Sequence, residues 1–373
     1  MPFDLSTLLF PLFAAAIALQ LACWLFFLTG IGKLKALPPV AKAALPGISI
    51  IVAARNERAN LQALLPALMA QEHPDFEVII VNDRSSDGTE TLLAAAEKQY
   101  PGLRALHIHE RPPHISGKKY ALTLGIKAAR HRQVLLTDAD CRPASTAWAA
   151  LMASGFARGA DIVLGFSAYR PQPGWLNYFI RFETLLTAIE YLGAAANKLP
   201  YMGVGRNLAY KKDLFLENKG FSGYQELIGG DDDLFVNKHA TARNTVVVTG
   251  SDALTLSTAK SSWKTFWQQK TRHLAAGRQY SFTTKLSLGL FNLSWIFTWL
   301  LAAACLSARI MPEWVLYSLL LRQLVLQAGF PLATKKLGVT FARTGIIFAD
   351  LFYVIYYIFA GTRALTGKTK TWA

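Results

Sequence analysis

Four apolar segments frame a central region in which apolar and polar positions alternate. Leu5 to Gly32 carries no charged residue and is longer than the about 20 residues that an α-helix needs to cross a bilayer. Three further apolar segments follow the central region: Leu286 to Ser307, Trp314 to Ala333 and Thr344 to Gly361. The pattern predicts an N-terminal membrane helix over residues 5–32, a linker over 33–47, and two to three membrane helices within 286–361.

The central region alternates between short apolar runs and amphipathic stretches. Four of the apolar runs are rich in β-branched residues and have the length of strands: Ile48 to Ala53, Phe76 to Val81, Leu103 to Ile108 and Gln133 to Thr137. A helical pattern separates each run from the next. This βαβαβαβ order predicts an open parallel sheet whose ligand site lies beyond the carboxyl ends of the strands. We assign residues 48–280 to one α/β domain.

Composition and charge place this domain beside a membrane. The chain is 52% hydrophobic and 17% charged, and it has a formal net charge of +15. Lysine and arginine gather on the domain side of the first and second apolar segments, so the positive-inside rule places the domain in the cytoplasm, at the plasma (inner) membrane. If all four segments crossed, the basic C-terminus would face outward, so one of the last two is expected to be re-entrant or interfacial.

The excess of positive charge is explained by the membrane. Basic residues that flank apolar segments bind anionic lipid headgroups. Nucleic-acid binding would require a basic surface interleaved with stacking aromatics or a known reading motif, and the sequence has neither. We therefore expect the membrane, and no nucleic acid, as a partner.

The loops after the predicted strands indicate how a nucleotide could be held. Neither G-x-G-x-x-G nor G-x-x-x-x-G-K-[ST] is present, so a diphosphate must be neutralised in another way, and a divalent cation on a carboxylate can do this. Asp138 and Asp140 follow the fourth strand with one residue between them, so both would point to one face. One could reach the metal and the other the sugar of the nucleotide. The alternatives, that they cap a helix starting near Ala144 or form a solvated turn, stay open.

Four motifs in the same order resemble family 2 glycosyltransferases of the GT-A fold. They are IIVAARNE at residues 50–57, VNDRSSDGT at 81–89, GK at 117–118 and DAD at 138–140, and the resemblance covers about residues 48–277. It implies a nucleotide-diphospho-sugar transferase domain with a nucleotide-sugar donor, which we expect to be a UDP-sugar. The donor-site residues that it implies are Asn56, Glu57, Asp83 on the uracil ring, Lys118 and Asp138, with Asp140 binding Mg²⁺ or Mn²⁺.

The segment IGGDDDLFVNKH, residues 228–239, resembles the acidic catalytic segment of this family. The resemblance assigns the general base to Asp231, although Gly230 stands where family members usually have Glu. A carboxylate within hydrogen-bond reach can take the proton of an attacking sugar hydroxyl. We expect the neighbouring carboxylates to raise the pKa of Asp231 and make it a better base. The alternative is a helix start whose acidic residues favour the helix dipole.

The segment WQQKTRHLAAG, residues 267–277, resembles the QxxRW signature of membrane-integrated family members. Gln269 and Arg272 match the signature, and His273 replaces its Trp. The resemblance implies that the arginine neutralises the leaving diphosphate, which suits a guanidinium that binds phosphate oxygens in pairs. The alternative is a basic interfacial helix with Trp263 and Trp267 at the lipid headgroups.

Two further features give structural predictions. Residues 175–197 are amphipathic and rich in aromatics, which suits either a core helix or a helix on the membrane surface at the acceptor entrance, and we favour the second. Arg322 and Asp350 lie inside apolar segments, where an unpaired charge costs several kcal/mol. We predict that they face the interior of the helix bundle and pair.

Together these features predict an inverting, metal-dependent transfer of a sugar from a nucleotide sugar to a membrane lipid or lipid-linked glycan acceptor. A processive polysaccharide synthase that extends an exported glycan is the alternative, but the missing Trp and a tail of at most three helices argue against it. A scaffold that binds nucleotide without turnover is disfavoured by the presence of Asp140, Asp231 and Arg272 together. A transporter is disfavoured because paired broken helices are absent.

Overall fold

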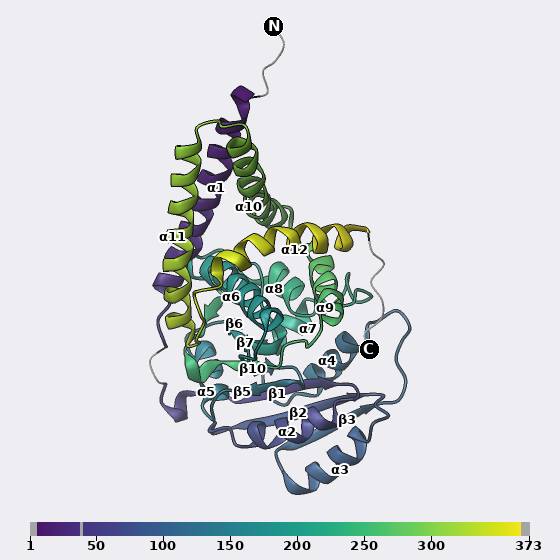
Figure 1. Cartoon of the computed structure of the whole chain (residues 1–373). Helices are drawn as coiled ribbons and strands as arrows, with labels where there is room; N and C mark the ends of the chain where they lie inside the picture. The colour runs from purple at the N-terminus through teal and green to yellow at the C-terminus, as the bar shows by residue number, and fades with distance from the viewer. Residues whose placement is uncertain (1–5, 38–39, 367–373) are drawn as a thin grey trace.

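The computed structural model, which describes residues 6–37 and 40–366, consists of an α/β domain and a bundle of long helices that projects from it (Figure 1). The bundle elements are α1 (Ser6–Lys33), α10 (Phe282–Ser307), α11 (Pro312–Leu337) and α12 (Ile346–Thr366). All four are long and apolar enough to cross a membrane, one N-terminal and three C-terminal, as the sequence predicted. Leu5, where the first predicted helix begins, lies outside the described residues.

The α/β domain is built on a seven-stranded sheet of order β3-β2-β1-β4-β8-β6-β9. Its strands are β1 (Ile48–Ala54), β2 (Phe76–Asp83), β3 (Leu103–Ile108), β4 (Gln133–Leu136), β6 (Ile162–Leu164), β8 (Leu208–Lys211) and β9 (Thr245–Val247). The first four strands are parallel, as predicted, whereas β8 is antiparallel to both β4 and β6. The carboxyl ends of β1, β2 and β4 therefore share one edge of the sheet.

Helices cover both faces of this sheet. They are α2 (Arg58–Met69), α3 (Thr89–Gln99), α4 (Gly117–Ala128), α5 (Trp148–Phe156), α6 (Trp175–Ala196), α7 (Lys212–Glu217), α8 (Asp233–His239) and α9 (Trp263–Ala276). Alternate residues of β1 point to opposite faces, so that Ile50 packs in the core with α2 and α5 while Ile51 packs in the core with α4 and α6. At Gly125 of α4 a β-carbon would lie 2.6 Å from Ile51 Cγ2, so this glycine lets the helix lie directly on the sheet.

A second, three-stranded sheet of order β5-β10-β7 extends the domain beyond β4. Its strands are β5 (Cys141–Pro143), β7 (Ser167–Tyr169) and β10 (Thr255–Ser257). Because β5 begins directly after Asp140 and α5 begins only at Trp148, the alternative that Asp138 and Asp140 cap a helix near Ala144 is wrong. Pairing with β10 extends the chain there instead.

The long helix α6 is a core helix, so the favoured prediction of a helix on the membrane surface is wrong. Fifteen of its 22 residues are buried. The helix lies between the α/β domain and the bundle, with β7 and β9 on one side and α1, α11 and α12 on the other. At Gly30 of α1 a β-carbon would lie only 2.0 Å from the carbonyl oxygen of Gly193, so α1 and α6 meet backbone to backbone. Apart from the exposed Trp175 at its start, the aromatic stripe that suggested lipid headgroups therefore packs against protein.

Arg322 and Asp350 pair inside the bundle, as predicted. Both side chains are fully buried, and Nη1 and Nη2 of Arg322 each donate to a carboxylate oxygen of Asp350 over 2.6 Å. Arg322 Nε also donates to Gln20 Oε1 of α1, and Gln323 donates to Asp350, each over 2.6 Å. This network joins α1, α11 and α12.

Candidate active site

One lysine joins two carboxylates that are far apart in the sequence. Lys118 Nζ, at the start of α4, lies 2.9 Å from Asp138 Oδ1 at the end of β4 and 3.1 Å from Asp231 Oδ2 in the loop before α8. The Asp231 side chain is only 6% exposed, whereas those of Lys118 and Asp138 are 25% and 33% exposed. The structure thus brings three of the predicted site residues together at the carboxyl edge of the sheet.

Neighbouring charges shift the pKa values of Lys118 and Asp231 in the direction opposite to burial. Burial alone would lower the pKa of Lys118, but the carboxylates of Asp138, Asp231 and Asp232 raise it well above its ordinary value. Burial alone would raise the pKa of Asp231, but Lys118 and Lys119 outweigh burial and lower it. The prediction that neighbouring acids raise the pKa of Asp231 is therefore wrong, because the sequence does not reveal the two lysines across the loop.

The other two aspartates of the triplet have structural partners. Asp232 Oδ2 accepts a hydrogen bond from Gly205 N over 2.6 Å, and its Oδ1 accepts one from Asp233 N at the start of α8. Asp233 accepts from Leu234 N over 2.8 Å and from the Tyr280 hydroxyl over 2.7 Å. Both residues cap or brace the helix, which matches the structural alternative, while the carboxylate of Asp231 faces Lys118.

These two braces also titrate unusually. Burial, with Asp231 next to it, raises the pKa of Asp232. Burial, with Asp232 next to it, raises the pKa of Asp233 to about 8. At neutral pH Asp233 therefore holds a proton, whereas Asp231, with its lowered pKa, is ionised.

Lys119 holds the loop that carries Asp231. Its ammonium is almost fully buried and donates to the carbonyl oxygens of Leu227, over 2.6 Å, and Gly229. Gly229 and Gly230 have φ of +90° and +76°, a backbone conformation that glycine adopts without strain. The sequence motif pointed to Lys118 and gave no role to its neighbour. A second lysine directly after a site lysine is the signal that was available.

Asp138 and Asp140 are both partly exposed, and Ala139 between them is buried. Glu57, after β1, belongs to the same acidic group: burial, Asp140 and Asp138 together raise its pKa in spite of a hydrogen bond from Asn60. Among the described residues no three His, Cys, Asp or Glu side chains form a metal site by themselves. Asp140 with Asp138 suits Mg²⁺ or Mn²⁺, since such ions take one or two carboxylates and complete their coordination with phosphates and water.

The loops after β1 and β2 are tied to each other. Asn56, with φ of +55°, accepts a hydrogen bond at Oδ1 from Ser86 N over 2.8 Å, and its own N–H donates to Ser85 Oγ. The Asp83 carboxylate is fully buried and accepts from Arg84 Nε over 2.8 Å. Asn56 therefore ties the two loops together, and Asp83 is the buried last residue of β2.

The helix α9 lies against the loop of Asp231. At Gly229 a β-carbon would lie 3.9 Å from Arg272 Cγ, so Arg272 is beside the turn that leads to Asp231. Gln269 lies about one turn earlier on the same helix and is partly exposed. Between them, the buried Lys270 pairs with Glu183 of α6, which also accepts from the Tyr356 hydroxyl of α12 over 3.3 Å. The helix is thus fixed to both the core and the bundle.

Arg206 is a further candidate that the donor-site motifs did not include. Its guanidinium lies 4.5 Å from the ring centroid of Tyr169, and its charge interacts with those of Asp140 and Asp138. Within the described part of the chain its Nη1 is buried and has no hydrogen-bond partner. A buried guanidinium nitrogen without a partner has lost its hydrogen bonds to water and has gained none from protein. This nitrogen can therefore donate to an anionic group in the site.

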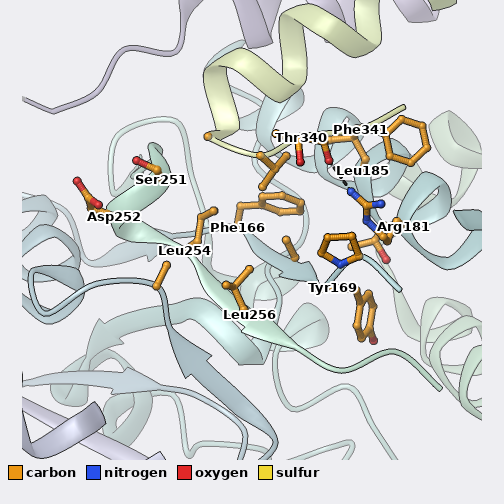
Figure 2. A pocket seen from close by; sticks show the side chains of 16 residues that line it. Phe166, Tyr169, Arg181, Leu185, Ser251, Asp252, Leu254, Leu256, Thr340 and Phe341 are labelled. Atoms are coloured by element: carbon orange, nitrogen blue, oxygen red, sulfur yellow. Dashed lines mark hydrogen bonds between the residues drawn. The ribbon is translucent and has the colours of Figure 1, made fainter. Parts of the chain in front are cut away.

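A cavity of about 380 Å³ lies on the other face of the second sheet (Figure 2). Leu256 of β10 and Leu254, just before this strand, line it, whereas Thr255 between them points the opposite way and donates to the Arg206 carbonyl over 3.0 Å. Tyr169 lines the cavity and also contacts Arg206, so it is shared by both sides of the sheet. The connection between α11 and α12 closes the cavity, and Arg181 brings a positive charge to its largely apolar wall.

Comparison with known sequences identifies the domain. Residues 49–217 match the family described as Glycosyl transferase family 2. The probable glycosyltransferase YdaM of Bacillus subtilis is 25% identical over 248 residues, which cover 63% of this chain and 56% of YdaM. A poly-beta-1,6-N-acetyl-D-glucosamine synthase of Staphylococcus epidermidis is 35% identical over 95 residues, which cover 25% of this chain and 22% of the synthase.

A beta-monoglucosyldiacylglycerol synthase of Trichormus variabilis is 35% identical over 106 residues, which cover 28% of this chain and 22% of that enzyme. The chain therefore spans about half or less of the length of these relatives. A solved structure of the mannosyltransferase PcManGT from Pyrobaculum calidifontis, in complex with GDP-Man and Mn²⁺, superposes with a TM-score of 0.60 at 20% identity. The match covers 96% of this chain and 99% of that one, and it shows a shared GT-A-like fold over both the α/β domain and the bundle.

Proposed function

Because residues 49–217 form a glycosyl transferase family 2 domain, we propose that the chain is an inverting, metal-dependent glycosyltransferase that moves a sugar from a nucleotide sugar to a membrane lipid or lipid-linked glycan. The contact of Lys118 with both Asp138 and Asp231 carries the proposal. It brings the predicted base close to the donor-site carboxylate at the carboxyl edge of the sheet, where a nucleotide sugar would bring its anomeric carbon.

The donor lies across the carboxyl edge of the sheet. Asp83 and Asp138 contact the nucleoside, and Asn56 and Glu57 shape the loop beside them. A divalent cation, when bound on Asp140, offsets the charge of the diphosphate. Arg206, whose charge interacts with that of Asp140, and Arg272, beside the loop of Asp231, carry guanidinium groups that can bind the phosphate oxygens of the leaving nucleoside diphosphate.

Asp231 acts as the general base. Its low pKa means that it is a carboxylate at neutral pH, but the ion pair with Lys118 makes that carboxylate a weak base. When the donor phosphates draw the Lys118 ammonium away, burial raises the basicity of Asp231. Asp231 then takes the proton of the acceptor hydroxyl while the hydroxyl oxygen attacks the anomeric carbon. The bond from that carbon to the diphosphate oxygen breaks, and the configuration at the anomeric carbon inverts.

We infer a UDP-sugar donor from the resemblance of the Asp83 motif, and the GDP-Man complex of PcManGT makes GDP-sugars the first competitor to test. A membrane acceptor is supported by the way α9, which carries Gln269 and Arg272, is fixed to α12 of the bundle. It is also in keeping with the glycolipid synthase among the relatives. We place the α/β domain on the cytoplasmic side of the plasma membrane.

A processive polysaccharide synthase is the second candidate, since one relative is a polysaccharide synthase. Only four helices in the described chain are long and apolar enough to cross a membrane, and α1, α10 and α11 pack on one another around aromatic side chains. That packing favours addition of single sugars over export of a polymer.

The experiment measures nucleoside diphosphate release by the full chain in native lipids with Mn²⁺ or Mg²⁺, across panels of UDP- and GDP-sugars. We expect release with one donor, loss of release with chelator, and loss in Asp231→Asn. Asp213→Asn is the matched control, because Asp213 lies on α7 and pairs with the exposed Arg132. Full release by Asp231→Asn contradicts the assignment of the base, and a labelled product that grows with time instead of staying at one addition favours the synthase.

A further inference from the structure

We propose that α12 lies along the membrane surface, with one face in the lipid and the other on the α/β domain, so that only α1, α10 and α11 cross. Length and apolarity alone make α12 a candidate span. Its contacts and its exposed side chains point to a different placement. The occupant of the exposed face is the acyl and headgroup boundary of an anionic phospholipid leaflet.

The exposed side chains of α12 form one stripe. They are Ile347, Phe348, Leu351, Ile355, Ile358 and Phe359, between 41% and 65% exposed. These positions recur at intervals of three and four residues, which is the spacing of one helix face. On the opposite face Ala349, Tyr353, Tyr356 and Ala360 are buried. A helix that is apolar on its exposed face and packed against protein on its other face suits a boundary between lipid and protein.

The buried face of α12 follows the α/β domain along much of the length of the helix. Phe352 lies 5.5 Å from Trp263 of α9, ring centroid to ring centroid, and the buried Tyr356, about one turn later, lies 5.7 Å from Trp267 of the same helix. A helix that left the domain to cross the bilayer would lose these contacts after its first turns. Figure 1 shows α12 running across the bundle above α6, α8 and α9, whereas α1, α10 and α11 run together away from the domain.

A hollow beside the stripe supports a lipid occupant. It has a volume of about 450 Å³ and is bounded by Trp175 of α6, Trp299 of α10 and exposed residues of α12, and its walls are almost purely apolar. Tryptophan is enriched where proteins meet the membrane boundary. The hollow therefore continues the apolar stripe onto α10, one of the crossing helices, and offers room for acyl chains.

The length of α1 agrees with a position of α12 at the membrane surface. The Gln20–Arg322–Asp350 network marks the level at which α12 joins the bundle. Beyond it α1 extends from Gln20 back to Ser6, about 21 Å at 1.5 Å per residue. A surface helix buries its apolar face about 5–10 Å into the boundary region. This depth and the length of α1 beyond Gln20 together approach the thickness of a hydrocarbon core, which is about 30 Å.

Charge favours the same arrangement. Arg363, near the end of α12, places its guanidinium 4.8 Å from the ring centroid of Phe359, so its stem follows the apolar stripe while the charge remains free for a lipid phosphate. Lys335 and Lys336 end α11, and Arg343 precedes α12. With three crossings, all these cations lie on the side of the α/β domain, as the positive-inside rule requires. The conflict that four crossings would create at the C-terminus disappears.

Label depth tests the proposal directly. The full chain, without its native cysteines, receives one new cysteine at a time in place of Phe348, Leu351, Ile355 or Phe359. Each cysteine is labelled with a fluorophore, and the depth of the label is measured with depth-dependent quenchers in vesicles of anionic phospholipid. We expect the four labels at one depth near the boundary. A depth that changes steadily by about 16 Å from residue 348 to 359, the rise of a perpendicular helix, overturns the proposal. Leu316→Cys and Leu324→Cys on α11 are the controls that must differ, by about 12 Å.

The position of the C-terminus gives a second, independent readout. In sealed vesicles with the α/β domain outside, protease should remove a C-terminal tag without detergent. Protection of the tag until detergent is added overturns the proposal, because it places the C-terminus across the membrane. Disulfide linkage of two copies through Ile355→Cys under oxidation would also overturn it, since the stripe would then be covered by a second chain.

Discussion

Lys118 balances the buried carboxylates, and its removal should leave a stability defect that depends on pH. Lys118→Met keeps the apolar stem and removes the charge that lies 3.1 Å from Asp231 and 2.9 Å from Asp138. A pair at 3.1 Å gains about 5 kcal/mol at an effective dielectric constant of about 20 and about 1 kcal/mol in bulk water. Because the Lys118 side chain is 25% exposed, we expect the loss to fall between these values.

The sign of the pH effect follows from the pKa of Asp231. In the native chain this pKa is lowered, so the ionised Asp231 adds stability above the unfolded pKa of about 3.9, and this stability is lost as the pH falls through the lower folded pKa. Without Lys118, burial and the adjacent acids raise the folded pKa above the unfolded value. The defect of Lys118→Met should therefore be largest at pH 8 and should shrink as the pH falls toward 5.

The assay is thermal unfolding in lipid nanodiscs, followed by intrinsic tryptophan fluorescence from pH 8 to pH 5. Lys127→Met is the matched control, because this lysine is exposed on the same helix and its side chain is remote from Asp231. A defect in Lys118→Met that equals the control, or that grows as the pH falls, would refute the reasoning.

Three further predictions follow from buried charges. Lys270→Met should destabilise the chain by about 3–5 kcal/mol in denaturant unfolding because Glu183 then lacks its partner, and the double variant with Glu183→Gln should recover most of the loss; additive losses would contradict this. Arg322→Gln should reduce folded yield in membranes, whereas joint replacement of Arg322 and Asp350 by leucine should restore it. Asp233→Asn should raise the melting temperature most at pH 8 and progressively less toward pH 4, because a carboxyl whose folded pKa of about 8 exceeds its unfolded pKa of about 3.9 costs stability that accumulates across this interval; an equal effect at pH 8 and pH 4 would contradict it.

The parts of the fold that repeat a simple period were predictable from the sequence. The four parallel strands follow from their β-branched runs, and the placement of Asp138 and Asp140 follows from the end of the fourth run. The Arg322–Asp350 pair was predictable because an isolated charge in an apolar helix must find a partner. In each case one local rule determines the outcome.

The remaining features depend on contacts between distant segments. The amphipathic pattern of α6 is the same whether its apolar face meets lipid or protein, so only the position of α1 and α11 decides that it is buried. The pKa of Asp231 depends on Lys118 and Lys119, more than a hundred residues away along the chain. The surroundings of Arg206 also depend on the fold, because Tyr169 and Asp140 come near it only through contacts between distant segments.

The backbone contact of Gly30 with Gly193 fixes the height of the proposed enzyme above the bilayer. A flexible linker would let a soluble domain reorient and meet acceptors at many distances from the membrane, whereas this contact holds α1 rigidly against the core. The search for acceptor then becomes two-dimensional, because molecules diffusing in the leaflet arrive at one set depth. Removal of α1 would also expose the buried side of α6 to water. An α/β domain released in this way should therefore precipitate instead of being active in solution.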